Sequence, residues 1–172
     1  MHLHITLLAA ITSDGFLTKG DDPYPQTWTS KEDKNLLTRM ASEYPLHVMG
    51  KKTYDVHQPK PKGKHIVVLT KESAEQISQK TDSFEYRNIS VTEFMDEYRN
   101  YERCLLLGGA YTYRQFIEAG VVSEAFITVE PVIAGSGVPF PSDNLKRYGL
   151  TLESKKTLNN TGTYLEHYVL KK

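Results

Sequence analysis

The acidic residue Asp33 stands where a surface helix should be apolar. The stretch "WTSKEDKNLL" (28–37) opens a helical pattern in which Asp33 shares a face with Leu36, Leu37 and Met40, at spacings of three, four and seven. A carboxylate that faces a core costs free energy unless it has a partner, and such groups gather at functional sites. Asp33 is therefore a candidate acid–base residue.

A purely structural role explains Asp33 as well. Either Thr29 or Ser30 can cap this helix, because Glu32 follows Thr29 by three residues and Asp33 follows Ser30 by three, as a capping box requires. An acid is also favoured by the positive end of a helix. Spacing alone leaves the structural and the functional interpretation open.

Two junctions between a strand and a helix could bind an anion. "VMGKKTYD" (48–55) passes through Gly50 and two lysines, with Thr53 opening a helical turn, and "LLLGGAYTYRQF" (105–116) passes through two glycines. Glycine lets the backbone approach an anion, and the N–H groups at a helix start bind phosphate. Each junction alone could be a tight turn with solvated lysines. Two of them favour a phosphate-bearing ligand, although the chain lacks the G-x-G-x-x-G of Rossmann domains.

These motifs require a frame of alternating strands and helices. Short runs rich in Val, Ile and Leu predict strands at 2–10, 46–49, 65–69 and 104–107, and helical patterns predict helices at 30–43, 73–80, 91–100 and 110–119. The alternation predicts an α/β domain with a largely parallel sheet. Ligands bind at the carboxyl ends of such strands, where both glycine junctions fall.

The last third of the sequence changes pattern. Strands are predicted at 123–133, 148–158 and 162–171 without an intervening helix, and "NNTG" (159–162) is a turn signal. The chain should therefore end in an antiparallel hairpin. Earlier in the chain, the loop 12–27 lacks any period, and loops of this length are often functional lids.

Composition limits the class of partner. The 172 residues, 39% of them hydrophobic, are enough for one core, so we expect one domain over 1–172. Lys and Arg together number 21, as do Asp and Glu, which argues against nucleic acid and anionic membranes and favours a small molecule. The single cysteine, Cys104, suits the cytoplasm. The apolar start is too short to span a bilayer, and no histidine group has metal-ligand spacing.

Five motifs together resemble a known fold family. In order and spacing, "ITLLAAITSDGFL", "WTSKED", "HVMGKKTYD", "GKHIVVLT" and "LLLGGAYTYRQF" are similar to the dihydrofolate reductase-like fold. That family covers dihydrofolate reductases and the pyrimidine reductases of riboflavin biosynthesis. The resemblance runs over nearly the whole chain. It implies NADPH as the cofactor and a pterin or pyrimidine as the substrate.

The resemblance also implies residue roles. It assigns catalysis to Asp33, which would hold the pterin ring, with Thr128 and Trp28 beside it. It assigns substrate contacts to Ala10, Leu37, His57 and Lys64. It assigns cofactor contacts to Ala9, Leu17, Gly50, Lys51, Lys52, Thr53, Thr70, Lys71, Gly108, Gly109, Ala110 and Tyr113. The loop 12–27 would be the mobile loop that closes over the nicotinamide.

The substrate is divided between the two branches. Lys64 stands where dihydrofolate reductases usually carry an arginine for the folate glutamate, and lysine lacks the bidentate fork. "EPVIAGSGVPFP" (130–141) resembles the pyrimidine reductase branch. Because Asp33 and Trp28 are both present, dihydrofolate is the favoured substrate, the riboflavin-pathway pyrimidine is the alternative, and a non-catalytic dinucleotide-binding module is a third reading. Either a monomer or a homodimer is compatible with the sequence.

Overall fold

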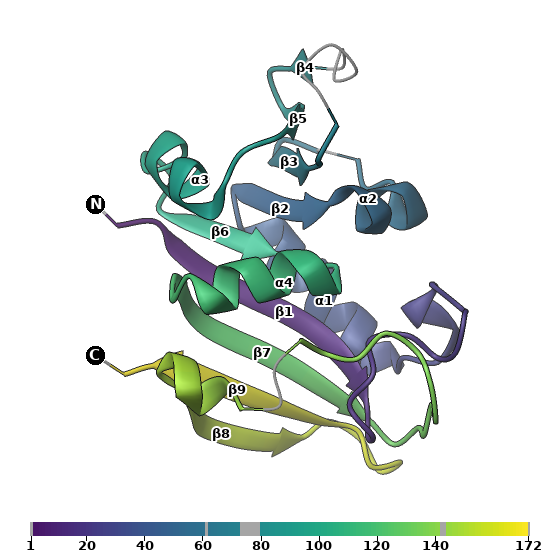
Figure 1. Cartoon of the computed structure of the whole chain (residues 1–172). Helices are drawn as coiled ribbons and strands as arrows, with labels where there is room; N and C mark the ends of the chain where they lie inside the picture. Colours follow the sequence, from purple (N-terminus) through teal and green to yellow (C-terminus); the bar gives the residue numbers. More distant parts are fainter. Residues whose placement is uncertain (1, 61, 73–79, 142–143, 172) are drawn as a thin grey trace.

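The computed structural model describes residues 2–60, 62–72, 80–141 and 144–171, and its centre is one twisted sheet (Figure 1). The strands within these ranges are β1 (His4–Thr12), β2 (Leu46–Gly50), β3 (His65–Leu69), β4 (Lys80–Thr81), β5 (Phe84–Arg87), β6 (Arg103–Leu106), β7 (Val122–Glu130), β8 (Leu150–Thr157) and β9 (Tyr164–Leu170). They lie in the order β4-β5-β3-β2-β6-β1-β7-β9-β8. The pairings from β5 to β7 are parallel, and the pairings at both edges are antiparallel.

Helices cover both faces of the sheet. They are α1 (Lys31–Glu43), α2 (Lys51–His57), α3 (Val91–Glu97) and α4 (Ala110–Glu118), with short 3-10 turns η1 (Pro25–Thr27) and η2 (Leu145–Tyr148). In Figure 1, α4 crosses in front of the sheet and α1 lies behind it. None of the helices within the described ranges is long and apolar enough to cross a membrane.

The alternation of side chains along β1 divides the core into two layers. Ile5 and Leu7, both fully buried, face the side of α3 and α4, where Phe94 and Phe116 meet edge to face with centroids 5.4 Å apart. Leu8 faces the opposite side and packs with α1. Successive strand residues point to opposite faces, so a strand covered on both sides must be apolar throughout. The continuous apolar run at the start of the sequence has this cause.

The predicted α/β class, the parallel sheet and the C-terminal antiparallel hairpin are confirmed. The helix predicted at 73–80 falls on 73–79, which lie outside the described residues, and on Lys80, which belongs to β4, so the predicted helix end is wrong. The sequence analysis missed β5, whose alternation of Phe, Glu, Tyr and Arg lacks a continuous apolar run. Helix α3 ends at Glu97, before the predicted end at 100.

One partly buried polar network ties the first strand to the last. The Glu124 carboxylate on β7 lies 3.1 Å from His4 Nε2 on β1 and 2.9 Å from His167 Nε2 on β9, and it accepts a hydrogen bond from the Thr6 hydroxyl. These bonds, with that of His4 the strongest, hold the pKa of Glu124 at about 2 against the effect of burial. The ionised carboxylate therefore stabilises the fold.

The first prediction concerns acid stability. Because the pKa of Glu124 in the fold lies below its ordinary value of 4.5, the stabilisation is complete above that pH and is lost as the pH falls toward about 2. Glu124→Gln should lower the free energy of unfolding at neutral pH by about 1–3 kcal/mol, the scale of hydrogen bonds to charged groups. Urea denaturation at a series of pH values measures this.

Glu118 is a suitable control, because it is exposed at the end of α4. Glu118→Gln removes the same charge and should leave the stability curve unchanged. If Glu124→Gln and Glu118→Gln give parallel curves between neutral and acid pH, the network around Glu124 does not stabilise the protein.

Candidate active site

The carboxyl ends of the central parallel strands border a large cleft. The arrowheads of β1, β2 and β6 point to the same side in Figure 1, and the cleft at this side has a volume of about 2140 Å³. It contains most of the residues assigned by resemblance: Ala9, Ala10, Leu17, Asp33, Leu37, Gly50, Lys51, Lys52, Thr53, His57, Lys64, Thr70, Lys71, Gly109, Ala110 and Tyr113. Trp28, Gly108 and Thr128 are not among its lining residues.

Asp33 is a buried acid on the cleft wall. Its residue is 9% exposed, and it shares the inward face of α1 with Leu36 and Met40, as its spacing predicts. Burial raises the pKa of the Asp33 carboxyl above its ordinary value. Among its neighbours, the Thr128 hydroxyl lowers this pKa, Glu130 raises it, and Lys34 lowers it. The carboxylate can therefore exchange a proton more readily than an exposed aspartate.

Ser30 caps α1, which settles the choice left open by the sequence. Its side chain accepts a hydrogen bond from the Asp33 N–H at 3.2 Å. The Ser30 N–H, however, donates to Glu130 Oε1 at 2.7 Å. The Asp33 backbone thus serves the cap, while the Asp33 side chain is part of the cleft wall.

Two residues assigned to catalysis by resemblance each have a buried polar atom without a hydrogen-bond partner among the described residues. These atoms are Trp28 Nε1 and Thr128 Oγ1. Thr128 lies on β7 directly opposite Ala10 of β1, and it is near enough to affect the pKa of Asp33. Buried polar groups in folded proteins nearly always have a partner, so the Thr128 hydroxyl fits a polar ligand or an ordered water near Asp33.

Glycines bring two helix starts together at the middle of the cleft. Gly50 caps α2 and Gly109 caps α4, neither helix has a side-chain cap, and the Gly50 N–H donates to the Gly108 carbonyl at 2.6 Å. A Cβ on Gly50 would lie 2.6 Å from Thr112 Oγ1, so no larger residue fits there without a shift. Helix α2 begins at Lys51, two residues before the start expected at Thr53. The exposed N–H groups form a cradle that fits the phosphates of a dinucleotide.

The cleft is cationic although the chain is neutral. Its described lining includes seven lysines, Lys34, Lys51, Lys52, Lys60, Lys62, Lys64 and Lys71, and two acids, Asp33 and Glu72. The sequence analysis missed Lys34, Lys60 and Lys62, although the repeat in "PKPKGK" was a visible signal. The low-dielectric walls of a cleft focus the electric field of these lysines, so the cleft attracts an anionic ligand.

The lysines differ in how they are held. Lys51 pairs with Asp55 at 2.8 Å, and Lys71 lies over the Tyr111 ring at 4.7 Å. Lys64 Nζ donates to the Ser42 carbonyl at 2.6 Å, near the end of α1. The position of Lys64 on the cleft wall agrees with its assignment by resemblance, but its ammonium already has one partner.

The loop after β1 is bound to the segment after β7. The Leu17 N–H donates to the Val138 carbonyl at 2.7 Å, and the Phe140 N–H donates to the Gly15 carbonyl at 2.9 Å. The Asp14 carboxylate accepts the Ala134 and Gly135 N–H groups, and these bonds, with that of the Thr12 hydroxyl, lower its pKa to about 2. Leu17 and Val138 both line the cleft. This ladder of hydrogen bonds between the two segments therefore holds that part of the cleft wall in place.

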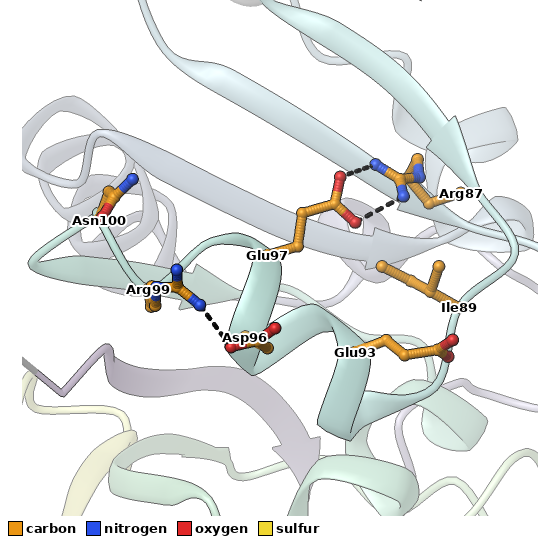
Figure 2. A pocket seen from close by; sticks show the side chains of 7 residues that line it. All are labelled: Arg87, Ile89, Glu93, Asp96, Glu97, Arg99 and Asn100. Carbon is orange, nitrogen blue, oxygen red and sulfur yellow. Dashed lines mark hydrogen bonds and ion pairs between the residues drawn. The ribbon is translucent and has the colours of Figure 1, made fainter.

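A second, smaller hollow of about 470 Å³ lies beside α3 and is shown in Figure 2. Four of its charged side chains form two ion pairs: Arg87 binds Glu97 through both terminal nitrogens, and Arg99 binds Asp96 at 2.6 Å. The fifth, Glu93, accepts hydrogen bonds from Ser90. Charges that satisfy each other in this way leave little for a ligand. The large cleft is therefore the candidate site.

The fold and the cleft define an α/β protein with a nucleotide-sized site at the ends of parallel strands. The sequence model of the dihydrofolate reductase family matches residues 4–170, so the chain belongs to the dihydrofolate reductase family. No curated protein sequence matches the chain.

Solved structures of two kinds share the fold. A protein assigned to riboflavin biosynthesis from Shewanella sp. PV-4 has a TM-score of 0.77 at 16% identity, covering 98% of this chain and 99% of its own. The diaminohydroxyphosphoribosylaminopyrimidine deaminase/5-amino-6-(5-phosphoribosylamino)uracil reductase of Thermotoga maritima has a TM-score of 0.76 at 14% identity, covering 99% of this chain and 57% of its own. Dihydrofolate reductase from Enterococcus faecalis, complexed with NADP(H) and RAB-propyl, has a TM-score of 0.73 at 15% identity, covering 98% of this chain and 97% of its own. At these identities the similarity establishes the fold.

The second prediction concerns Gly137. This residue lies in the segment after β7 that is hydrogen-bonded to the loop after β1. A Cβ there would lie 2.4 Å from the Thr18 carbonyl oxygen, and its φ of +142° disfavours a side chain. Gly137→Ala should therefore push the two segments apart and lower stability by about 1–3 kcal/mol, the usual cost of overpacking. Hydrogen exchange of the Leu17 amide, which donates across the ladder, should become faster.

Gly15→Ala provides the matched control. Gly15 also has a positive φ, +89°, but no atom lies within 4 Å of its added Cβ. It therefore carries the backbone strain without the collision. Equal Leu17 exchange rates in Gly137→Ala and Gly15→Ala would show that close approach at Gly137 does not hold the ladder.

Proposed function

We propose that the chain, as one reductase domain over 1–172, uses NADPH to reduce dihydrofolate to tetrahydrofolate. The observation that carries this proposal is the buried Asp33 carboxylate, which lines the same cleft as the glycine cradle and the lysines. A carboxylate on an apolar wall can bind the amino-pyrimidine edge of a pterin through two hydrogen bonds. The cradle fits the cofactor on the other side of Ala9 and Ala10.

The chain's own residues bind, orient and move one proton. Asp33 would hold the pterin edge, and the negative charge of its carboxylate would favour the protonated substrate. Thr128 and Trp28, whose hydroxyl and indole N–H are buried without partners among the described residues, would support that edge from behind the cleft lining, as the resemblance implies. Tyr113 donates its hydroxyl to the Leu8 carbonyl at 2.5 Å and so fixes the wall behind β1. When bound, NADPH supplies the hydride, and the cleft supplies placement and exclusion of water.

The cofactor assignments follow the course of the cleft. Gly108, Gly109 and Ala110 would approach the pyrophosphate, because the start of α4 has no side-chain cap and leaves its N–H groups for an anion. The cationic segment after β2, with Lys51, Lys52 and Thr53, and the residues after β3, Thr70 and Lys71, would hold the remaining phosphates. Leu17, from the loop after β1, would cover the nicotinamide.

A second function is supported by the lysines at the other end of the cleft. Lys34, Lys60 and Lys62 form, with Lys64, a cationic wall that suits the ribose phosphate of the riboflavin-pathway pyrimidine as well as the carboxylates of folate. The Thermotoga maritima protein, a deaminase and 5-amino-6-(5-phosphoribosylamino)uracil reductase by name, shares this fold. Turnover of both substrates, followed by the loss of NADPH absorbance, separates the two. Tight NADPH binding without turnover of either would favour the non-catalytic module.

The third prediction tests Asp33. Asp33→Asn keeps the shape and removes the charge, so dihydrofolate turnover should fall by roughly 100-fold or more, the scale of a positioned acid–base group. The variant should recover part of its rate on acidification, because the medium then protonates the substrate. The fold should be at least as stable as before, since burial opposes the ionised form of Asp33. The measurement is kcat/KM against pH, with thermal unfolding alongside.

If Asp33→Asn and the unmodified protein give parallel profiles of kcat/KM against pH with similar magnitude, this prediction is contradicted. Asp33 would then serve only in helix capping. Glu32→Asn, one residue earlier in the same helix turn and not among the cleft-lining residues, serves as control and should leave turnover unchanged.

The fourth prediction concerns the cofactor. NADPH should bind more tightly than NADH, because Lys51 and Lys52 follow a glycine at the end of β2 and line the cleft. Changing both to Ala should reduce that preference by about 1–3 kcal/mol, the scale of charge-assisted hydrogen bonds. Calorimetric titration of the two cofactors measures it.

The matched control removes two cations from η2. Lys146 and Arg147 are exposed and are not among the cleft-lining residues. Their double Ala variant should keep the preference for NADPH. Equal affinity of the unmodified protein for NADPH and NADH would contradict the assignment of Lys51 and Lys52 as cofactor-binding residues.

A further inference from the structure

Two helices in this chain begin with the same sequence pattern but close their first turns differently. Ser90 caps α3, and Glu93, three residues later, returns its carboxylate to the Ser90 N–H at 2.7 Å, which completes a capping box. Ser30 caps α1, and Asp33 is likewise three residues later. Here the Ser30 N–H donates to Glu130. The acid inside the helix is thus replaced by one that lies 100 residues further along the chain.

Glu130 is held firmly in that place. It is the last residue of β7 and 2% exposed. One carboxylate oxygen accepts the Ser30 N–H at 2.7 Å, and the other accepts the hydroxyl of Thr163, also buried, at 2.7 Å. The turn before β9 is also joined to α1, where Asn159 Nδ2 donates to Glu32 Oε2 at 3.1 Å. The fold therefore holds Glu130 in the place that the Asp33 carboxylate would occupy in a capping box.

We propose that Glu130 is a positioning residue for Asp33: by binding the Ser30 N–H it leaves the Asp33 carboxylate to face the cleft. The proposal rests on the proposed function only in giving that freed carboxylate a substrate to bind. A short aspartate at this position of a helix otherwise has its own N-cap amide within reach. The structure provides a competitor that occupies this amide.

Glu130 also supplies charge. The groups that face Asp33 are Lys34 from α1, Tyr113 from α4, and Thr128 with Glu130 from β7. Of these, Glu130 is the like charge, and it adds to the rise that burial causes in the pKa of Asp33. A like charge nearby disfavours ionisation. The same residue therefore directs Asp33 and helps it to take up a proton.

Two variants separate the effect of Glu130 on the orientation of the Asp33 side chain from the effect of its charge on the pKa of Asp33. Glu130→Gln can still accept the Ser30 N–H but removes the charge, so the pKa of Asp33 should fall while kcat/KM for dihydrofolate well above that pKa stays close to the unmodified value. Glu130→Ala releases the Ser30 N–H. The Asp33 carboxylate should then turn to it, and kcat/KM should fall by between about 10-fold and 100-fold, as for a misplaced catalytic group. NADPH affinity should not change in either variant.

Two readouts need no substrate. Titration of the Asp33 carboxyl by carbon NMR, with the signal assigned through Asp33→Asn, should give a lower pKa in both Glu130 variants. A crystal structure of Glu130→Ala should show Asp33 accepting the Ser30 N–H. Glu32→Gln is the control, because it removes an acid from the same helix turn without freeing the N-cap amide. It should shift the pKa of Asp33 less than Glu130→Gln does.

The outcomes distinguish this proposal from the function it rests on. An Asp33 side chain that still faces the cleft in Glu130→Ala overturns the positioning role of Glu130, and an unchanged pKa of Asp33 in Glu130→Gln overturns its electrostatic role. If Glu130→Ala does not fold, Glu130→Met, which keeps the length of the side chain but offers the Ser30 N–H no oxygen, replaces it in the crystal structure. If instead both titrations shift as expected but the unmodified protein does not reduce dihydrofolate, the reductase assignment fails and the positioning role stands.

Discussion

The parallel pairing of β1 with β7 is the constraint on which the site depends. It places Ala10 opposite Thr128 and Thr12 opposite Glu130, at the end of the sheet where α1 begins. A shift of one residue would turn every one of these side chains to the other face. Thr128 and Glu130 would then face the core of α3 and α4, and Asp33 would lose the two groups that act on its pKa.

Local periodicity made part of this arrangement predictable. The inward direction of Asp33 follows from its spacing to Leu36 and Met40, and the glycine junctions follow from strand runs that end in Gly50 and Gly109. Such signals lie within one turn or one strand, so they survive in the sequence. The hairpin of β4 and β5 gave no such signal, because its short strands at the sheet edge need no continuous apolar run.

The other features of the site depend on contacts between residues that are far apart in the sequence, and no local pattern indicates them. Nothing in the stretch around Ser30 reveals that its amide is bound by Glu130, and the capping-box pattern suggests the opposite. The cationic cleft is hidden in the same way, since equal numbers of acidic and basic residues in the chain conceal seven lysines around one cleft. Only the topology, which gathers α1, α2 and the segments after β2 and β3 around the strand ends, reveals the clustering.

Asp33 and the lysines then make opposite electrostatic demands on one cleft. A cationic wall lowers the pKa of a nearby carboxyl, and Lys34 does so for Asp33. An acid that must accept a proton in such surroundings needs burial and a second negative charge to offset them. Desolvation by the apolar face of α1 and the charge of Glu130 provide both. The apolar wall and the buried acid behind it are therefore as much a part of the site as Asp33 itself, because they oppose the effect of Lys34 and raise the pKa of Asp33 above its ordinary value.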